Sequence, residues 1–411
     1  MGVWALFLAI TSIFEATKTN LLKNAHIRFV SINENRQERT SIAASSFLIN
    51  ILISAAFIVF ILFFSDWLSD ILNMGNDLAI MLKWFIPGLC GMVIFSHLEA
   101  VQQSNLDFKG SFAGYFVRQL LFFLIILWHA FRGIPFSLKY LAIYQSISIG
   151  TGTIMLYIYT RKYLHYAFHF SRVWIKKIIG YGGYIFSSGL IGNLFANLDQ
   201  FMIASFLSSS SVAYYNAASR INSLIDIPSF AASEIMFPKV SQAAEQAGNE
   251  KVKYLYERMV AILLCFTIPA ALFIIVFPKL IITLIAGEEY QAASIILQLY
   301  MITGVLRPMQ NQAANILNSI GKPGLCLLIN AISLAACLII NYICLLNFGF
   351  YGAAIGTLIT CLLGCTAWYF VIKRQIGAQM LYIVKHMIDF YKLLYTQLVN
   401  ILIKKKGNSY S

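Results

Sequence analysis

The chain has 411 residues, of which 59% are hydrophobic and only 11% are charged, and its mean hydropathy is +0.73. Because a soluble domain carries roughly a quarter of charged residues, this composition excludes a soluble globular protein and predicts an integral membrane protein. The formal net charge of +13 would suggest a nucleic-acid partner in a soluble protein, but here it is explained by basic loops on one side of a membrane.

Apolar stretches long enough to cross a bilayer predict about eleven membrane-spanning helices, connected by short loops. They lie at 3–30, 42–64, 78–103, 110–130, 138–160, 178–207, 211–238, 254–277, 289–317, 323–346 and 351–372. One set of alternate loops holds fourteen lysine and arginine residues and the other set holds three. The basic set is therefore predicted to be cytoplasmic, together with the C-terminus.

An internal repeat links the two halves of the chain at a spacing of about 210 residues, as in transporters built from two related bundles. Val30 falls on Val240 and Ser31 on Ser241, and the order and length of the following spans also match. An even number of helices in each repeat makes the repeats parallel. Only 178–207 lacks a counterpart, which would precede Met1, so we expect a first helix to be missing from this chain.

These patterns predict an all-α integral membrane protein with two pseudo-symmetric six-helix bundles. Residues 1–160 form an N-terminal bundle of five spans, 161–177 form a basic cytoplasmic linker, and 178–373 form a C-terminal bundle of six spans. Residues 374–411 form a basic cytoplasmic tail. Its segment 378–403 has apolar residues at helical spacing opposed by Lys385, Asp389 and Lys392, which favours an amphipathic helix on the membrane surface over another span.

Ionisable residues inside the predicted spans identify the candidate site, because each costs about 2.5–3.5 kcal/mol at the bilayer centre. The helices that carry them also carry most of the amides and pair with one another in the repeat, so we expect them to line a cavity between the bundles. The candidate substrate-binding cations are Lys18, Arg220 and Arg307, and the candidate ion-coupling or polar lining residues are Glu15, Asp199 and Asp226.

Each charge also has a plain structural explanation. Glu15 and Lys18, spaced i, i+3, could neutralise each other, and Asp199 could make a helix-packing hydrogen bond. Lys23 and Glu99 lie near helix ends, where a side chain can reach the interface. No nucleophile–base set, phosphate-binding loop or metal-ligand spacing is found. We therefore expect a protein that is not an enzyme and that has no metal or cofactor beyond a coupling H⁺ or Na⁺.

Three segments resemble a known family. LDQFMIASFLSSSSVAYYNAASRI (Leu198 to Ile221), FPKVSQ (Phe237 to Gln242) and NILNSIGKPG (Asn315 to Gly324) resemble polysaccharide flippases of the O-antigen and capsule branch. Their superfamily includes the MATE exporters and the peptidoglycan-precursor flippase. The resemblance implies a MATE-like fold that moves undecaprenyl-diphosphate-linked oligosaccharides from the cytoplasmic to the outer leaflet by cation-coupled alternating access. Asp199 matches the family's aspartate, and Lys18, Arg220 and Arg307 would supply its cationic cavity.

The resemblance further implies a monomer in the bacterial inner membrane that takes part in lipopolysaccharide biosynthesis. Its expected partners are the bilayer, a lipid-linked oligosaccharide and other glycan-assembly membrane proteins, and not nucleic acid. Two other functions remain open. A MATE-type exporter of drugs or organic cations would need a net acidic cavity, and a membrane glycan polymerase or ligase would need a sizeable outer loop with catalytic residues.

Overall fold

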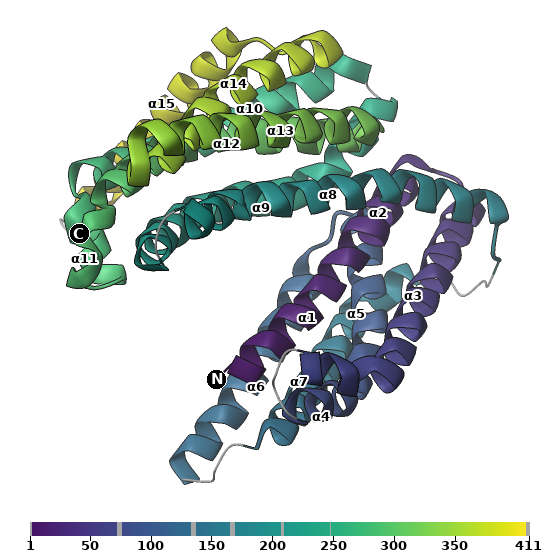
Figure 1. The fold of residues 1–411 in the computed structure, drawn as a ribbon. Helices are drawn as coiled ribbons and strands as arrows, with labels where there is room; N and C mark the ends of the chain where they lie inside the picture. The colour runs from purple at the N-terminus through teal and green to yellow at the C-terminus, as the bar shows by residue number, and fades with distance from the viewer. Residues whose placement is uncertain are drawn as a thin grey trace. The chain divides into compact units, whose positions relative to one another are not determined.

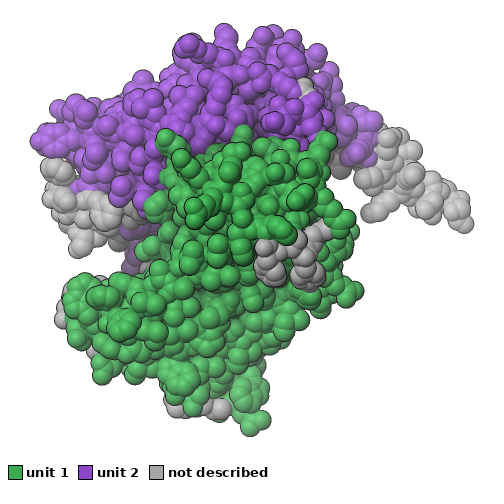
Figure 2. Space-filling model, turned by 90° about the vertical axis from the view of Figure 1, so that its right-hand side faces the viewer, with its two compact units in different colours: residues 1–186 green, residues 187–411 purple. Residues whose placement is uncertain are grey.

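The computed structural model describes residues 2–71, 76–132, 137–164, 169–206, 209–246 and 248–407, and over these ranges the chain is helical without a β-strand. It divides into two compact units, Met1–Phe186 and Ser187–Ser411 (Figure 2). The boundary falls inside a helix, after the predicted start of the C-terminal bundle at residue 178. That helix begins within the predicted linker 161–177, so the linker is itself partly helical.

The first unit contains the predicted N-terminal spans (Figure 1). Its helices are α1 (Gly2–Lys18), a π-helical turn (Thr19–Lys23), α2 (Asn24–Ile32), α3 (Arg36–Ile71), α4 (Asp77–Trp84), α5 (Ile86–Ser104), α6 (Lys109–Arg132), α7 (Leu138–Thr160), a 3₁₀ turn (Arg161–Tyr163) and the first half of α8 (Arg172–Phe206). A bend of 46° separates α4 from α5, where Pro87 starts a new helix because its ring cannot continue the preceding one.

The second unit contains the rest of α8 and the remaining spans. Its helices are α9 (Ser209–Gln246), α10 (Gly248–Val276), α11 (Pro278–Ile285), a 3₁₀ segment (Glu288–Ala293), α12 (Ser294–Ser319), α13 (Pro323–Phe348), a 3₁₀ turn (Gly349–Tyr351), α14 (Gly352–Ile376) and α15 (Met380–Gly407). Gly377 ends α14 in the left-handed conformation, with φ +73°, as expected for a helix C-terminus.

The chain is a multi-pass membrane protein. Within the described ranges, six helical stretches are long and apolar enough to cross a membrane, and the bent pair α4–α5 makes a seventh. Each of the predicted spans falls on a long helix or on consecutive helices, but the span 3–30, which the π-helical turn interrupts, is not among these stretches, and neither are α8 and α9. Polar residues lower the hydropathy of these two helices, which are the ones predicted to carry much of the site.

The parallel repeat appears in the packing of each unit taken by itself. In the first unit α6 packs on α7, and α2, α3 and α7 pack on α5; in the second, α13 packs on α14, and α9, α10 and α14 pack on α12. The hydroxyl of Ser31 donates to the carbonyl of Ser104 at 3.3 Å, and the hydroxyl of Ser241 donates to the carbonyl of Ser319 at 3.3 Å. The prediction of two pseudo-symmetric bundles is therefore confirmed.

The C-terminal helix α15 packs lengthwise along α10 (Figure 1). Near its start Tyr382 contacts Lys253, and further along the Tyr391 hydroxyl donates to the carbonyl of Cys265 at 2.8 Å. Both helices advance in the same direction between these contacts, over about 18 Å of α10 at 1.5 Å per residue. This packing differs from the predicted amphipathic helix on the membrane surface, because α15 follows a membrane-spanning helix.

Candidate functional site

The second unit brings two predicted site residues into one ion pair. Arg307 on α12 donates to Asp226 on α9, with Nη1 at 2.8 Å from Oδ2; the Asp226 side chain is 9% exposed and that of Arg307 is 31% exposed. With its amide oriented to satisfy both neighbours, Asn222 donates to the carbonyl of Tyr300 and accepts from Arg307 Nη1 at 3.0 Å. Gly304 leaves room for Asn222, because a β-carbon there would lie 2.9 Å from its side-chain amide.

The same pair leaves one oxygen available. Asp226 Oδ1 is buried and has no hydrogen-bond partner among the described residues. A buried carboxylate oxygen without a donor is costly, and a proton or a small cation at that oxygen would satisfy it. The sequence predicted separate roles for Arg307 and Asp226, in substrate binding and ion coupling respectively, whereas the structure joins them.

In the first unit Glu15 on α1 pairs with Arg118 on α6, with Oε1 at 3.6 Å from Nη1. The ion-pair partner is thus on a neighbouring helix, and not Lys18 one turn further along α1. Lys18 is 4% exposed, and its Nζ lies 5.1 Å from the centre of the Phe14 ring. It makes no ion pair or hydrogen bond with another described side chain. The π-helical turn follows directly, and such turns are frequent at functional sites.

Lys23 and Glu99 are not snorkelling residues but a buried ion pair, with Nζ at 3.0 Å from Oε1 and side chains 10% and 6% exposed. Gln103 donates to the same oxygen at 3.2 Å, and the Tyr115 hydroxyl donates to the other oxygen at 3.3 Å. Because both carboxylate oxygens are bonded, the pair ties the π-helical turn to α5 and α6 as a structural element.

Two of the predicted site residues, Arg220 and Asp199, are not part of any ion pair that the structure describes. Arg220 on α9 has an exposed side chain, and no ion pair joins it to any residue that the structure describes. The side chain of Asp199 lies outside the described part of the chain, so the predicted role of Asp199 stays a prediction.

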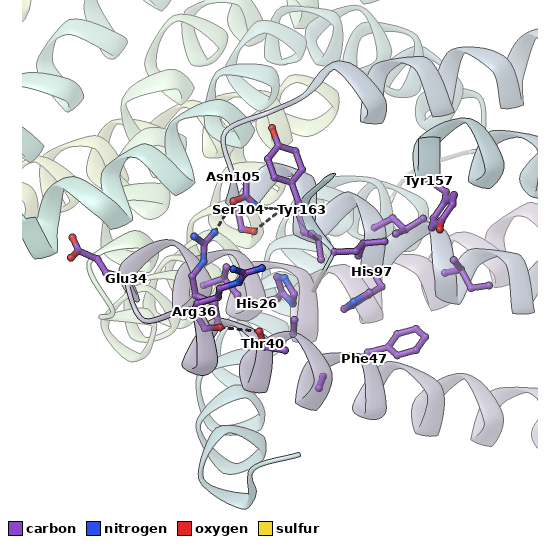
Figure 3. A pocket seen from close by; sticks show the side chains of 18 residues that line it. His26, Glu34, Arg36, Thr40, Phe47, His97, Ser104, Asn105, Tyr157 and Tyr163 are labelled. Atoms are coloured by element: carbon purple, nitrogen blue, oxygen red, sulfur yellow. Dashed lines mark hydrogen bonds between the residues drawn. The ribbon is translucent and has the colours of Figure 1, made fainter. Parts of the chain in front are cut away.

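A cavity of about 480 Å³ lies in the first unit among α2, α3, α5 and the end of α7 (Figure 3). It is lined by His26, His97, Arg36 and Arg39, none of which was predicted as a site residue. His97 lies inside the predicted span 78–103, and the two arginines lie between the spans 3–30 and 42–64, among the charges of the basic loops. No spacing signal could have joined His26 to His97, because they come from separate helices.

A polar cluster outside the spans links the loop after α5 to the end of α7. Lys162 Nζ lies 3.0 Å from Asp107 Oδ2, the Tyr163 hydroxyl donates to the same oxygen at 3.0 Å, and the Lys109 amide donates to Oδ1 at 3.1 Å. Burial opposes ionisation of Asp107, but these bonds outweigh it and lower the pKa of that carboxyl. The hydrogen bonds to Tyr163 and Asp107 raise the pKa of Lys162.

Comparison with known sequences indicates the family. A family model described as "Polysaccharide biosynthesis protein" matches residues 1–295. A probable low-salt glycan biosynthesis flippase of Haloferax volcanii, Agl15, is 28% identical over 182 residues, which are 44% of this chain and 39% of that protein. The lipopolysaccharide biosynthesis protein WzxC of Escherichia coli is 22% identical over 348 residues, which are 82% of this chain and 68% of that protein.

Comparison with solved structures gives the fold. The Vibrio cholerae MATE transporter VcmN in its bent form superposes with a TM-score of 0.77 at 16% identity, covering 92% of this chain and 89% of that chain. An outward-facing multidrug MATE transporter of the MOP superfamily superposes with a TM-score of 0.78 at 14% identity, covering 92% and 87%. The predicted MATE-like fold is therefore confirmed.

Proposed function

The chain belongs to the polysaccharide biosynthesis protein family, and we propose that it flips a polyprenyl-diphosphate-linked oligosaccharide from the cytoplasmic to the outer leaflet. The glycan flippase Agl15 and the lipopolysaccharide biosynthesis protein WzxC are relatives, and the MATE fold is a transporter fold. The comparisons favour a transporter over a membrane polymerase or ligase. Because the aligned segment covers less than half of Agl15, the substrate and the mechanism are part of the proposal.

The way in which the intramembrane charges are paired supports an anionic substrate. The carboxylates of Glu15, Glu99 and Asp226 each have a cationic partner. Within the described part of the chain Lys18 and Arg220 have no such carboxylate partner. Among these side chains and their ion-pair partners there are five cations and three carboxylates, and this excess favours a diphosphate over an organic cation. A guanidinium also binds phosphate through two parallel hydrogen bonds.

The Asp226–Arg307 pair supplies the coupling step of the proposal. A proton that binds Asp226 Oδ1 would neutralise the carboxylate and weaken its bond to Arg307. The released guanidinium could then bind a substrate phosphate, and loss of the proton would restore the ion pair. The proton and the phosphate both favour the broken ion pair, and two ligands that favour the same state are positively coupled. Sodium at the same oxygen would act similarly.

The experiment is complementation of a bacterial strain that lacks its own flippase and makes a lipid-linked oligosaccharide. The chain should restore glycan on the cell surface, whereas Arg220→Ala should restore less than a tenth of it at equal membrane abundance. Arg172→Ala, which removes an exposed arginine at the start of α8, is the matched control and should restore the wild-type amount. Export by Arg220→Ala at the wild-type level would remove this arginine from the mechanism.

We place the protein in the bacterial inner membrane, as a monomer with the connection between α14 and α15 in the cytoplasm. The excess of basic residues in one set of loops supports this orientation. A cysteine introduced at Gln379, which is exposed between α14 and α15, should react with a membrane-impermeant maleimide only after the cells are opened. Labelling of intact cells would reverse the orientation.

A further inference from the structure

The cavity in the first unit is charged at one end and apolar at the other. Figure 3 shows Arg36 and Asn105 at one end, Phe47 and Tyr157 at the other, and His26 and His97 between them. Its volume of about 480 Å³ falls in the range of small-molecule sites, roughly 300–1,000 Å³. All of its lining residues belong to residues 26–164, so the first unit forms it alone.

The charged end is suited to an anion. Arg36 and Arg39 lie on the first turn of α3, and the one carboxylate among the lining residues is Glu34. Arg39 donates to Asn105 Oδ1 at 2.6 Å, which holds its guanidinium at the cavity and leaves other N–H groups for a ligand. Two guanidinium groups against one carboxylate give this end a net positive charge, and phosphate is the anion whose geometry they match.

His26 is a second, independent sign of a ligand. The side chain is fully buried, and neither ring nitrogen has a hydrogen-bond partner among the residues that the structure describes. Its neighbour His97 contacts it edge to face, with ring centres 5.5 Å apart, and offers no hydrogen bond. Buried polar atoms are nearly always bonded. A ligand oxygen in the cavity would give His26 the partner it lacks.

The apolar end is suited to hydrocarbon. Ile94 and Tyr157 line it and are 47% and 43% exposed, and they lie on membrane-spanning helices. A ligand here needs an anionic head and an apolar chain. An acidic phospholipid has both, the cytoplasmic leaflet is rich in such lipids, and the cavity is too small for an attached oligosaccharide.

We propose that this cavity is a binding site for an acidic phospholipid, with the phosphate at Arg36 and Arg39, a head-group oxygen at His26, and one acyl chain along Phe47 and Ile94. The site is distinct from the charged residues assigned to transport and does not depend on the proposed function. Such a lipid would hold α3 against α5 and α7.

Native mass spectrometry of the delipidated full chain tests the proposal with three probes: phosphatidylglycerol, phosphatidylcholine and undecaprenyl phosphate. Phosphatidylglycerol should bind at least tenfold more tightly than phosphatidylcholine. Arg36→Gln combined with Arg39→Gln should abolish that preference, and Ala43→Phe, which fills the cavity and keeps its charges, should prevent binding. The matched controls are Arg172→Gln with Lys176→Gln, and Ala55→Phe on the exposed side of α3, and both should bind as the wild type does.

Equal binding of the two phospholipids would overturn the proposal, as would wild-type binding by Ala43→Phe. Undecaprenyl phosphate that displaces phosphatidylglycerol at equal concentration, and loses its own binding in Ala43→Phe, would identify a polyprenyl phosphate as the occupant and would also overturn it. Thermal melting of each variant without lipid separates lost binding from lost folding. If the double arginine variant does not fold, the comparison of phosphatidylglycerol binding by Ala43→Phe and by Ala55→Phe decides the result.

Discussion

Asp226 and Arg307 form an ion pair across α9 and α12 at 2.8 Å, and each lies beside a proline inside its own helix. Pro228 follows Asp226 by two residues, and Pro308 follows Arg307 directly. A proline inside a helix removes a backbone hydrogen bond and favours a kink. The pair therefore connects two helices at places where each lacks a backbone hydrogen bond.

Removing one partner of this pair should destabilise the protein. Arg307→Gln leaves the Asp226 carboxylate buried without its cation. This change costs about 3–5 kcal/mol of stability in a fully buried ion pair. Because Arg307 is partly exposed, we expect a loss of about 1–3 kcal/mol here. The combined Asp226→Asn and Arg307→Gln variant should recover most of the lost stability. Thermal melting in detergent measures both. Melting of the single variant at the wild-type temperature would contradict a stabilising role.

Gly182 should tolerate no side chain. A β-carbon on this residue of α8 would overlap the carbonyl of Leu21 in the π-helical turn, whereas one on Gly180 would meet open space. Gly182→Ala should therefore lose about 2 kcal/mol or more, as overpacking does, and Gly180→Ala should melt close to the wild type. Equal melting of the two variants would show that α8 does not pack against this turn.

The packing of α15 gives a test on two adjacent residues. Ile383 is 2% exposed and packs among residues that include Trp368 and Ile372, whereas Val384 is 47% exposed. Ile383→Ala should cost about 2–5 kcal/mol, and Val384→Ala should stay within about 0.5 kcal/mol. If both variants melt as the wild type does, α15 is not docked on α10 and a surface helix becomes the better description.

The stabilising effect of the Asp107 cluster should be lost both at low pH and at high pH. The pKa of Asp107 lies below its ordinary value of 3.8, so its stabilising effect is complete above that value and is lost as the pH falls through the lowered pKa. The pKa of Lys162 lies above its ordinary value of 10.5, so its effect is lost only as the pH rises through the raised pKa.

Asp107→Asn should therefore melt below the wild type at pH 7, and the difference should shrink below about pH 3. Glu245→Gln, which removes an exposed carboxylate elsewhere, serves as the control and should melt as the wild type does at both pH values. A difference between Asp107→Asn and the wild type that is the same at both pH values would contradict the electrostatic origin.

Hydropathy and the repeat were sufficient to predict the spans and the two bundles. Ser31 and Ser241, aligned by sequence alone, make the same hydrogen bond in the two units. The charge partners could not be predicted, because hydropathy does not determine how each helix is rotated about its axis. Glu15 meets Arg118 on α6 instead of Lys18 one turn away, and Asp226 meets Arg307.

Other features depend on packing that leaves no periodic signal. His26 lies close to His97 only because α2 packs on α5, and each alone resembles an ordinary packing residue. The apolar residues of the segment 378–403 have a helical spacing that fits a lipid surface and a neighbouring helix equally well. The contacts of Tyr382 and Tyr391 with α10 show that α15 packs on a neighbouring helix.

Transport by the purified chain in sealed liposomes tests the central proposal most directly. Polyprenyl-diphosphate oligosaccharide is placed in both leaflets, and the fraction accessible to an external glycosidase is followed after a proton or sodium gradient is imposed. The proposal predicts that this fraction rises above one half with the wild type and stays at one half with Arg220→Ala or without a gradient. An unchanged fraction with wild-type protein under both gradients would contradict cation-coupled flipping.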